Sequence, residues 1–168
     1  MIYKSLASVG VLLLILGLAE FLFWKENSND RPEPEIQQQI LLYYYDAERD
    51  RDPDGNILCS NKGLVEIERS ISPSENNIEK AIQLLISDKI NDADSAHGLS
   101  SEFPLDGFIL TDTALIDGSL LLTFEDPLHK TSGGSCRVNI MWQQIEATAK
   151  QFAEVRQVTF TPTELFQP

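Results

Sequence analysis

The clearest pattern of apolar and polar positions in this chain lies between residues 133 and 161. A glycine-rich turn leads into a helical repeat, after which the period changes and residues 155–161, with Val155 and Val158, favour a β-strand. One face of the helix is apolar, and Gln144 falls outside that face. The face consists of Met141, Ile145, Thr148 and Phe152. The pattern predicts a helix laid on a sheet.

Two strands and a helix are expected upstream of this unit. Residues 40–45 form a nearly continuous apolar run, which suits a central strand, and residues 64–71 alternate as a second strand does. A helix start follows, with Ser72 as the capping residue, Pro73 at the first helical position and Glu75 three residues after the cap. We expect this helix to continue to residue 87. Its apolar stripe is Ile78, Ala81, Ile82, Leu85 and Ile86.

The remaining elements complete the expected fold. Residues 87–103 are polar and predict a loop, and residues 125–135 predict another. Between them, residues 108–116 and 119–124 flank Asp117 and Gly118, a dipeptide that tolerates the positive φ angles of a tight hairpin turn. The order β-β-α-β-β-α-β predicts an α+β two-layer sandwich, with a mixed sheet of about five strands and two helices on one face.

The amino-terminal segment is the most apolar part of the chain. Residues 6–24 are long enough to cross a hydrocarbon layer of about 30 Å as a helix, and their one charged residue, Glu20, falls near the far end. A cleaved signal peptide is the alternative, because Gly17 and Ala19 supply small residues before a cut at Glu20. We therefore expect a single span in the cell membrane. The short tail before the span favours an amino terminus in the cytoplasm and an extracytoplasmic domain after the span.

The composition divides the chain into three parts and limits its partners. We expect a transmembrane anchor over residues 1–25, a polar tether with prolines over residues 26–38, and a folded domain over residues 39–168. The formal net charge of -13 at pH 7 disfavours nucleic acid and anionic lipid surfaces as partners. The span is therefore expected to hold the protein at the membrane, while the acidic surface keeps the domain soluble.

Three segments resemble the GerMN domain, the sporulation and spore germination module of bacterial envelope proteins. They are the strand LYYYDAERD at residues 42–50, the hairpin turn, and the GGSC turn with the helix and strand that follow it. The resemblance covers roughly residues 39–161. It implies an exported, membrane-anchored domain that assembles envelope complexes and has no established catalytic residues. The positions that carry it are Asp117, Gly118, Gly133, Gly134, Ile145, Thr148, Phe152, Val155 and Val158. The sequence shows no second copy of the domain.

The two cysteines, Cys59 and Cys136, allow one intramolecular disulfide. An oxidising compartment favours the bond, and the resemblance implies a cysteine before the second strand and another at the second helix. Closing a loop of this length contributes about 4 kcal/mol in the chain-entropy model. Two unrelated buried thiols are the alternative. A catalytic thiol is the least favoured interpretation, because neither cysteine has a nearby histidine in the sequence.

An acidic segment offers a candidate calcium site. Asp50, Asp52, Asp54 and Gly55 match the first half of a calcium-binding loop, in which alternating oxygen ligands surround the cation. The second half fails, because Asn61 stands where a bidentate glutamate is expected. A solvated acidic loop is therefore preferred, with calcium as the alternative and no other cofactor expected.

Two further features suggest chemistry only weakly. The turn that contains Gly133 and Gly134 could present main-chain N–H groups to an anion, but it lacks the lysine of a phosphate-binding loop. His97 and His129 do not have zinc-ligand spacing with each other or with the cysteines. Ordinary surface positions explain both histidines.

The leading functional hypothesis is a non-enzymatic, membrane-anchored module that assembles with itself or with an envelope protein, through a sheet edge or a helix face. The alternative is a module that binds cell-wall glycan or a metal, for which the tyrosines at residues 43–45 could supply stacking surfaces. A hydrolase built on Asp126 and His129 is the third hypothesis, and the sequence displays no nucleophile and base for it.

Overall fold

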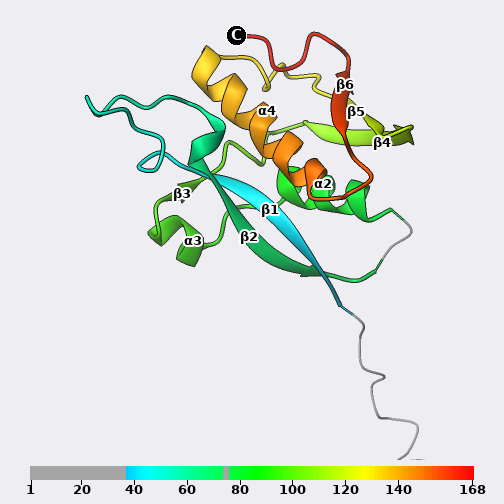
Figure 1. Ribbon diagram of the computed structural model, residues 1–168. Helices are drawn as coiled ribbons and strands as arrows, with labels where there is room; N and C mark the ends of the chain where they lie inside the picture. Colours follow the sequence, from blue (N-terminus) through cyan, green and yellow to red (C-terminus); the bar gives the residue numbers. More distant parts are fainter. Residues whose placement is uncertain (1–36, 74–75) are drawn as a thin grey trace, which may run out of the picture. The chain divides into compact units, whose positions relative to one another are not determined.

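The computed structural model describes residues 37–73 and 76–168. The apolar run at residues 40–45 and the alternating run at residues 64–71 pair in it to form the first sheet. Strand β1 (Gln38–Asp46) pairs antiparallel with β2 (Leu64–Ile71). The short β3 (Leu99–Ser100) pairs with the carboxyl end of β1, so the strand order is β2-β1-β3 (Figure 1). Leu42 and Tyr44 are completely buried on the core side of β1. Both strands predicted from the sequence are confirmed.

The second sheet is mixed. Strands β4 (Ile109–Ile116) and β5 (Ser119–Glu125) form the expected antiparallel hairpin, and β5 pairs in parallel with β6 (Gln157–Thr161). Asp117 and Gly118 make the turn with φ angles of 49° and 79°, the left-handed conformation that the dipeptide predicts. The hairpin prediction is confirmed.

Two long helices join the sheets. Helix α2 (Asn77–Ser87) packs on α4 (Ser135–Lys150), on β4 and on β1, while α4 also packs on β1 and β6. Figure 1 shows α4 running diagonally across the domain beside α2. The apolar stripe predicted for α2 is confirmed, since all of its residues are buried. Both helices therefore contact both sheets and close a single core.

The expected single sheet of about five strands is wrong, because the described residues form two three-stranded sheets. The side chains of α4 occupy the edge of β1 at which a further strand would have to pair. The expected loop at residues 87–103 is also partly wrong, since it contains α3 (Asp92–Ala96) and β3. Asn91 starts α3 by accepting a hydrogen bond from the Asp94 N–H at 2.8 Å.

Helix boundaries differ from the sequence prediction in two places. Asn76, rather than Ser72, caps α2, because its Oδ1 accepts a hydrogen bond from the Glu79 N–H at 3.0 Å. Helix α4 ends before Phe152, and Val155 precedes β6 although it is buried as expected. Glu75 lies outside the described residues.

Residues 37–168 form one compact unit, and the membrane predictions fall elsewhere in the chain. Within residues 37–73 and 76–168, no helix is long and apolar enough to cross a bilayer. The expected span at residues 6–24 and almost all of the expected tether lie outside the described residues. A short 3₁₀ turn, η1 (Asn61–Gly63), leads into β2 and completes the elements of the unit.

Candidate interaction surface

Polar side chains of α4 hydrogen-bond the main chain of β1, on the edge that β3 extends. Gln151, which caps the helix, accepts from the Leu41 N–H and donates to the Leu41 C=O, both at 2.7 Å. Gln144 donates to the Tyr43 C=O at 3.0 Å, and Thr148 accepts from the Tyr43 N–H at 3.3 Å. The spacing of four and three residues places these side chains on one helix face. Helix α4 therefore takes the place of a neighbouring strand and seals this edge.

Gln144 is buried, although the apolar pattern of the helix predicts this residue outside the packed face. Gln144 and Thr148 are 0% exposed, and their hydrogen bonds to β1 offset part of the cost of burying polar groups. Ile145, Val155 and Val158 are buried as well, and Phe152 packs against the core. The positions that carry the family resemblance on this helix and strand are therefore residues of the fold, not an exposed contact surface.

The outer edge of β4 is open. Within the described residues, β4 pairs with β5 alone, and it carries a single charged residue, Asp112. The outer strand of the other sheet, β2, carries Glu66, Glu68 and Arg69, and charges of this kind protect a strand edge from pairing. A register shift between Leu110 and Asp112 leaves residues 113–116 as the regular part of the β4 edge.

The hairpin exposes large apolar side chains beside this edge. Ile116 is 69% exposed and Ile109 is 50% exposed, while Leu115 and the β5 residue Leu121 are each 39% exposed. Leu121 lies opposite Ala114 on the face of the hairpin that turns away from the buried Leu120, Leu122 and Phe124. We refer to the β4 edge and these four exposed side chains as the hairpin surface.

Helix α2 fixes β4 from the core side. The Thr113 hydroxyl accepts a hydrogen bond from Asn76 Nδ2 at 2.7 Å and lies 3.4 Å from the Glu79 carboxylate. Asn76 is also the cap of α2, so the start of the helix and the middle of the strand are held together. The hairpin surface therefore belongs to a preorganised element.

A disulfide joins the loop after β1 to the first turn of α4. Cys59 and Cys136 are bonded, with Cα atoms 5.2 Å apart and a separation of 77 residues, so the predicted pairing is present in the structure. Asn139 and Gln143 of α4 donate to the Cys59 C=O at 2.7 and 3.3 Å. The same helix therefore holds the loop covalently and by hydrogen bonds.

Asp50 is buried and holds this loop together through its hydrogen bonds. It is 1% exposed, and its carboxylate accepts hydrogen bonds from the Tyr45 hydroxyl at 2.6 Å and from the Ser60 N–H and hydroxyl, each at 2.5 Å. Burial alone would raise the pKa of Asp50, but the hydrogen bonds from Ser60 and Tyr45 and the nearby charge of Lys62 lower it below the ordinary value. Burial and the Asp50 carboxylate together raise the pKa of Tyr45 to about 12.

Asp50 and Asp52, two of the carboxylates proposed as calcium ligands, accept hydrogen bonds from different partners. Asp50 binds the donors inside the loop, whereas Asp52 accepts from Asn56 Nδ2 at 2.9 Å and from the Asn56 and Asp54 N–H groups at 2.8 and 2.9 Å. No group of three or more histidine, cysteine or acidic residues in the described ranges is arranged to hold a metal ion. The arrangement lends no support to calcium, and binding by Asp50, Asp52 and Asp54 stays a prediction.

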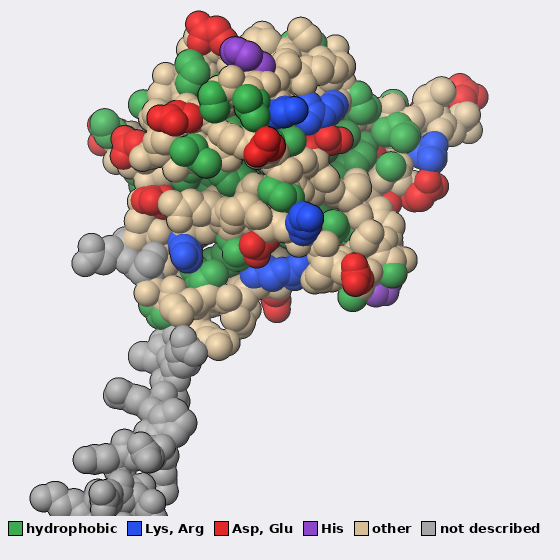
Figure 2. All heavy atoms as spheres, turned by 180° about the vertical axis from the view of Figure 1, so that it is seen from behind, with side chains coloured by type: hydrophobic (Ala, Val, Ile, Leu, Met, Phe, Trp, Pro, Cys, Tyr) green, Lys and Arg blue, Asp and Glu red, His purple; other side chains and the backbone are tan. Residues whose placement is uncertain are grey.

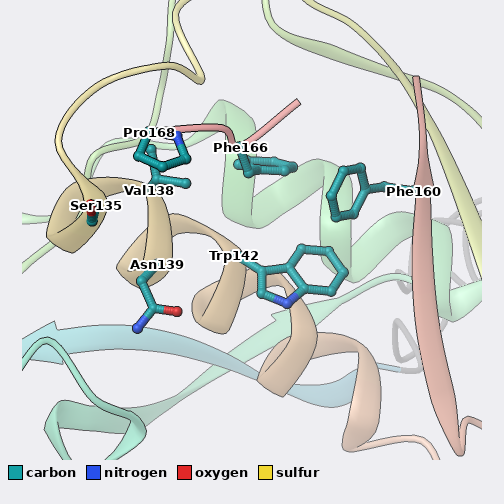
Figure 3. A pocket seen from close by; sticks show the side chains of 7 residues that line it. All are labelled: Ser135, Val138, Asn139, Trp142, Phe160, Phe166 and Pro168. Atoms are coloured by element: carbon teal, nitrogen blue, oxygen red, sulfur yellow. The ribbon is translucent and has the colours of Figure 1, made fainter. Parts of the chain in front are cut away.

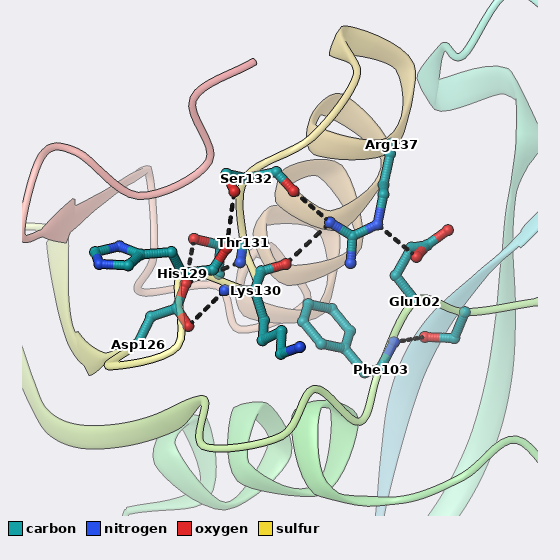
Figure 4. A network of polar contacts seen from close by, with 9 residues as sticks. Glu102, Phe103, Asp126, His129, Lys130, Thr131, Ser132 and Arg137 are labelled. Carbon is teal, nitrogen blue, oxygen red and sulfur yellow. Dashed lines mark hydrogen bonds and ion pairs between the residues drawn. The ribbon is translucent and has the colours of Figure 1, made fainter.

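Asp126 organises the loop that precedes α4 (Figure 4). Its carboxylate accepts hydrogen bonds from the Lys130 N–H, the Thr131 N–H and the Thr131 hydroxyl, all at 2.8 Å. Burial opposes ionisation, but these hydrogen bonds, together with the nearby charge of His129, lower the pKa of Asp126. The carboxylate proposed for a hydrolase is therefore engaged in holding its own loop.

Arg137 fixes the glycine turn from the other side (Figure 4). Its guanidinium group donates to the main-chain oxygens of Lys130 and Ser132 at 2.9 and 2.6 Å and to the Glu102 carboxylate at 2.7 Å. Gly133 lies against this side chain, since an added Cβ would meet Arg137 Nη1 at 3.3 Å, whereas Gly134 has open space around it. Arg137 therefore holds the main chain that leads into α4.

The surface charge is dispersed. Figure 2 shows acidic side chains spread over the visible face, with basic side chains among them. Several charges form local pairs, such as Arg69 with Asp94, Arg137 with Glu102, and Lys150 with Glu146. The net charge of -13 is therefore not concentrated in one patch on that face.

The fold defines an α+β domain in which two helices close two three-stranded sheets. The chain belongs to the Germane family, described as sporulation and spore germination, whose profile matches residues 41–162. The resemblance that the sequence carries to the GerMN domain is confirmed by this match. The family is not a known enzyme family.

A solved structure has a similar fold. The tandem GerMN domains of the sporulation protein GerM from Bacillus subtilis superpose with a TM-score of 0.54 and 17% sequence identity, covering 79% of this chain and 42% of that chain. At this identity the likeness shows the fold alone. The chain spans less than half of the tandem structure that it matches. No curated protein matches the chain.

Proposed function

We propose that this domain is a non-enzymatic assembly module, held at the cell membrane by its amino-terminal segment, and that it joins a second copy or an envelope protein through the hairpin surface. The observation that carries the proposal is the contrast between two strand edges. The β1 edge is closed by Gln144, Thr148 and Gln151, whereas the β4 edge is open and bordered by exposed apolar side chains.

Strand addition suits this edge for physical reasons. An added strand supplies partners for the main-chain groups of β4, and the apolar side chains at its borders become buried at the same time. Thr113, Ala114, Leu115 and Ile116 carry no charge and no proline that would oppose pairing. Because Thr113 is held by α2, little conformational entropy is lost when the strand accepts a partner.

The polar groups of the domain support a structural role. The Asp126 carboxylate binds its own loop, Asp50 is saturated by Tyr45 and Ser60, and both cysteines are consumed by the disulfide. These four groups, which the sequence offered for chemistry, thus have partners within the fold. This use favours assembly over hydrolysis.

The test compares two exposed apolar positions in the full-length chain. Ile116→Lys places a charge on the hairpin surface, and Leu128→Lys is the matched control because Leu128 is 52% exposed in a loop outside the hairpin. We expect Ile116→Lys to abolish concentration-dependent association in sedimentation velocity and to remove a photo-crosslink placed at residue 115 in cells. Equal association of both variants, or a monomeric parent chain without crosslinks, would refute the proposal.

The membrane part of the proposal has its own test. Residues 6–24 carry the apolar segment, and we expect the chain to stay with membranes during alkaline carbonate extraction and to be released by detergent. Added protease should digest the domain in spheroplasts if it faces away from the cytoplasm. Release by carbonate, or protection in intact spheroplasts, would contradict the proposed anchoring or orientation respectively.

A further inference from the structure

A small pocket opens between α4, β6 and the carboxyl-terminal segment, at the opposite edge of the second sheet from β4. Its volume is about 250 Å³. The side chains that matter for its chemistry are Ser135, Val138, Asn139 and Trp142 of α4, together with Phe160 and Phe166 (Figure 3). Because it lies away from the hairpin surface, its function is independent of the proposed assembly.

Aromatic rings make the apolar side of the pocket. The rings of Trp142 and Phe160 meet at 4.7 Å with an angle of 61°, and Phe160 meets Phe166 edge-on at 5.2 Å and 84°. Phe166 and Val138 are each 6% exposed, so they form the floor. Rings that brace one another in this way present a fixed apolar surface.

Hydrogen-bonding groups lie along the other side. Figure 3 shows the Asn139 amide and the indole nitrogen of Trp142 on the same side of the pocket, away from Phe160 and Phe166. Asn139 Nδ2 donates to the Cys59 C=O at 2.7 Å, which directs this nitrogen to the disulfide loop and leaves Oδ1 as an acceptor. Within the described residues, neither the Ser135 hydroxyl nor the Trp142 indole N–H has a hydrogen-bond partner.

The lining also limits the charge of a ligand. None of the side chains around the pocket is ionisable, and the whole chain carries a net charge of -13. An anionic group would find no positive partner there and would be repelled by the surrounding protein. A purely aliphatic ligand would cover the Ser135 and Asn139 polar atoms without bonding them, at a desolvation cost of the kind that opposes binding. A neutral ligand with one apolar side and one hydrogen-bonding side fits both limits.

We propose that this pocket binds one N-acetylated sugar ring of a neutral oligosaccharide. The apolar face of the ring and the acetyl methyl group pack on the aromatic side and on Val138. The acetamido N–H donates to Asn139 Oδ1, the acetamido C=O accepts from the Trp142 indole N–H, and a ring hydroxyl bonds Ser135. Acetamido groups supply one donor and one acceptor together, which matches the acceptor and the donor that the pocket offers. The volume admits one ring and not a whole chain.

The first experiment titrates the full-length chain with chitotetraose, a neutral N-acetylated oligosaccharide, and with cellotetraose, which lacks the acetamido groups. The chain has two tryptophans, so Trp24→Phe makes Trp142 the sole reporter of fluorescence. We expect a saturable change of the Trp142 emission with chitotetraose, and binding of cellotetraose that is at least about 10-fold weaker, since its ring leaves the donor and acceptor unmatched. No saturable change up to about 10 mM chitotetraose, or equal binding of both sugars, overturns the proposal.

Variants then place the bound sugar. Trp142→Phe keeps an aromatic ring but removes the N–H, and Ser135→Ala removes one exposed hydroxyl at the start of α4. Saturation-transfer NMR on the acetyl methyl protons and calorimetry measure binding in both variants without tryptophan fluorescence. Each variant should weaken chitotetraose binding about 5- to 10-fold, the effect of one lost hydrogen bond.

Ser95→Ala in α3 is the matched control and should bind chitotetraose as the parent chain does. Unchanged affinity in both Trp142→Phe and Ser135→Ala would refute this site, and Ser135→Ala decides alone if the tryptophan variant does not fold.

Discussion

The amide of Gln151 pairs with both main-chain groups of Leu41, a residue 110 positions earlier in the chain. Its Oε1 accepts from the Leu41 N–H and its Nε2 donates to the Leu41 C=O, each at 2.7 Å. A glutamine amide has the same donor and acceptor as a peptide group, so Gln151 substitutes for one residue of a missing strand. The β1 edge is sealed, whereas the β4 edge is open and bordered by exposed apolar side chains, and this contrast is the basis of the proposed assembly.

Replacing Gln151 with leucine tests the seal directly. Leucine keeps the approximate size of the side chain but leaves both Leu41 groups without their partners, and we expect a loss of about 1–3 kcal/mol in the free energy of unfolding. Urea denaturation of the variant measures this loss. Gln157→Leu is the control, because Gln157 is exposed and its side chain makes no hydrogen bond in the described part of the chain. Equal stability of the two variants would contradict a sealing role for Gln151.

The local elements of the fold were predictable because their signals are local. The apolar run of β1, the stripe of α2 and the turn at Asp117 and Gly118 each depend on neighbouring residues, and all three are present. The seal was not predictable, since Gln144 and its partner Tyr43 are 101 residues apart and a glutamine on a helix has the pattern of a solvent-facing residue. The prediction of one sheet instead of two is wrong for the same reason, because the side chains that seal β1 are distant from it in the sequence.

The candidate surfaces were less accessible to sequence reasoning. An oxidising compartment and the family resemblance favour a disulfide between Cys59 and Cys136, and the bond is present in the structure. The aromatic pocket joins Trp142 with Phe160 and Phe166, which come from separate elements, so no spacing rule brings them together. The exposure of Ile116 could not be predicted from the sequence either. Alternation predicts two faces of a hairpin, but it does not predict which face another layer covers.

Gly63 lies beneath the ring of Tyr45, which makes this position sensitive to a single added methyl group. A Cβ at residue 63 would meet the ring at 2.3 Å, and moving Tyr45 would break its hydrogen bond to Asp50. We expect Gly63→Ala to lower the free energy of unfolding by about 1–3 kcal/mol through overpacking. Gly134→Ala is the matched control, since its Cβ meets nothing within 4 Å and its φ of -65° suits alanine. Chemical denaturation of both variants measures the difference in their free energies of unfolding. A Gly63→Ala variant as stable as Gly134→Ala would contradict the close packing of Gly63 against Tyr45.

The disulfide is expected to contribute stability without defining the fold. Cys59→Ser with Cys136→Ser removes a cross-link that spans 77 residues, which the chain-entropy model values at about 4 kcal/mol. Asn139 and Gln143 still bind the Cys59 main-chain oxygen, so the loop should keep its place in the reduced protein. Circular dichroism of the double variant should match that of the parent, while its urea midpoint falls. A reductant should lower the midpoint of the parent and leave the double variant unchanged, and an equal response in both would refute this account.

Asp50 should make the domain sensitive to acid. Its pKa in the folded protein is lowered by Ser60 and Tyr45, whose hydrogen bonds outweigh the opposing effect of burial. The unfolded chain therefore takes up a proton more readily than the folded domain. The stability that Asp50 contributes is fully present above the ordinary carboxyl pKa of about 3.9, and it is lost as the pH falls through the lower folded value. Urea titrations from pH 7 to pH 2 should show a shallower acid decline in Asp50→Asn than in Asp54→Asn, which removes an equal charge from an exposed position of the same loop.

The same hydrogen bond predicts an alkaline limit. Tyr45 has a folded pKa of about 12, above the ordinary tyrosine value of 10.0, because burial and the Asp50 carboxylate both oppose its ionisation. A raised pKa means that the neutral hydroxyl stabilises the fold fully below pH 10 and that this contribution is lost as the pH rises towards 12. Tyrosinate absorbance should show that Tyr45 ionises last among the tyrosines and together with unfolding. In Tyr45→Phe that late step should be missing and the alkaline unfolding should begin at a different pH; a late step that persists in this variant would assign it to another tyrosine.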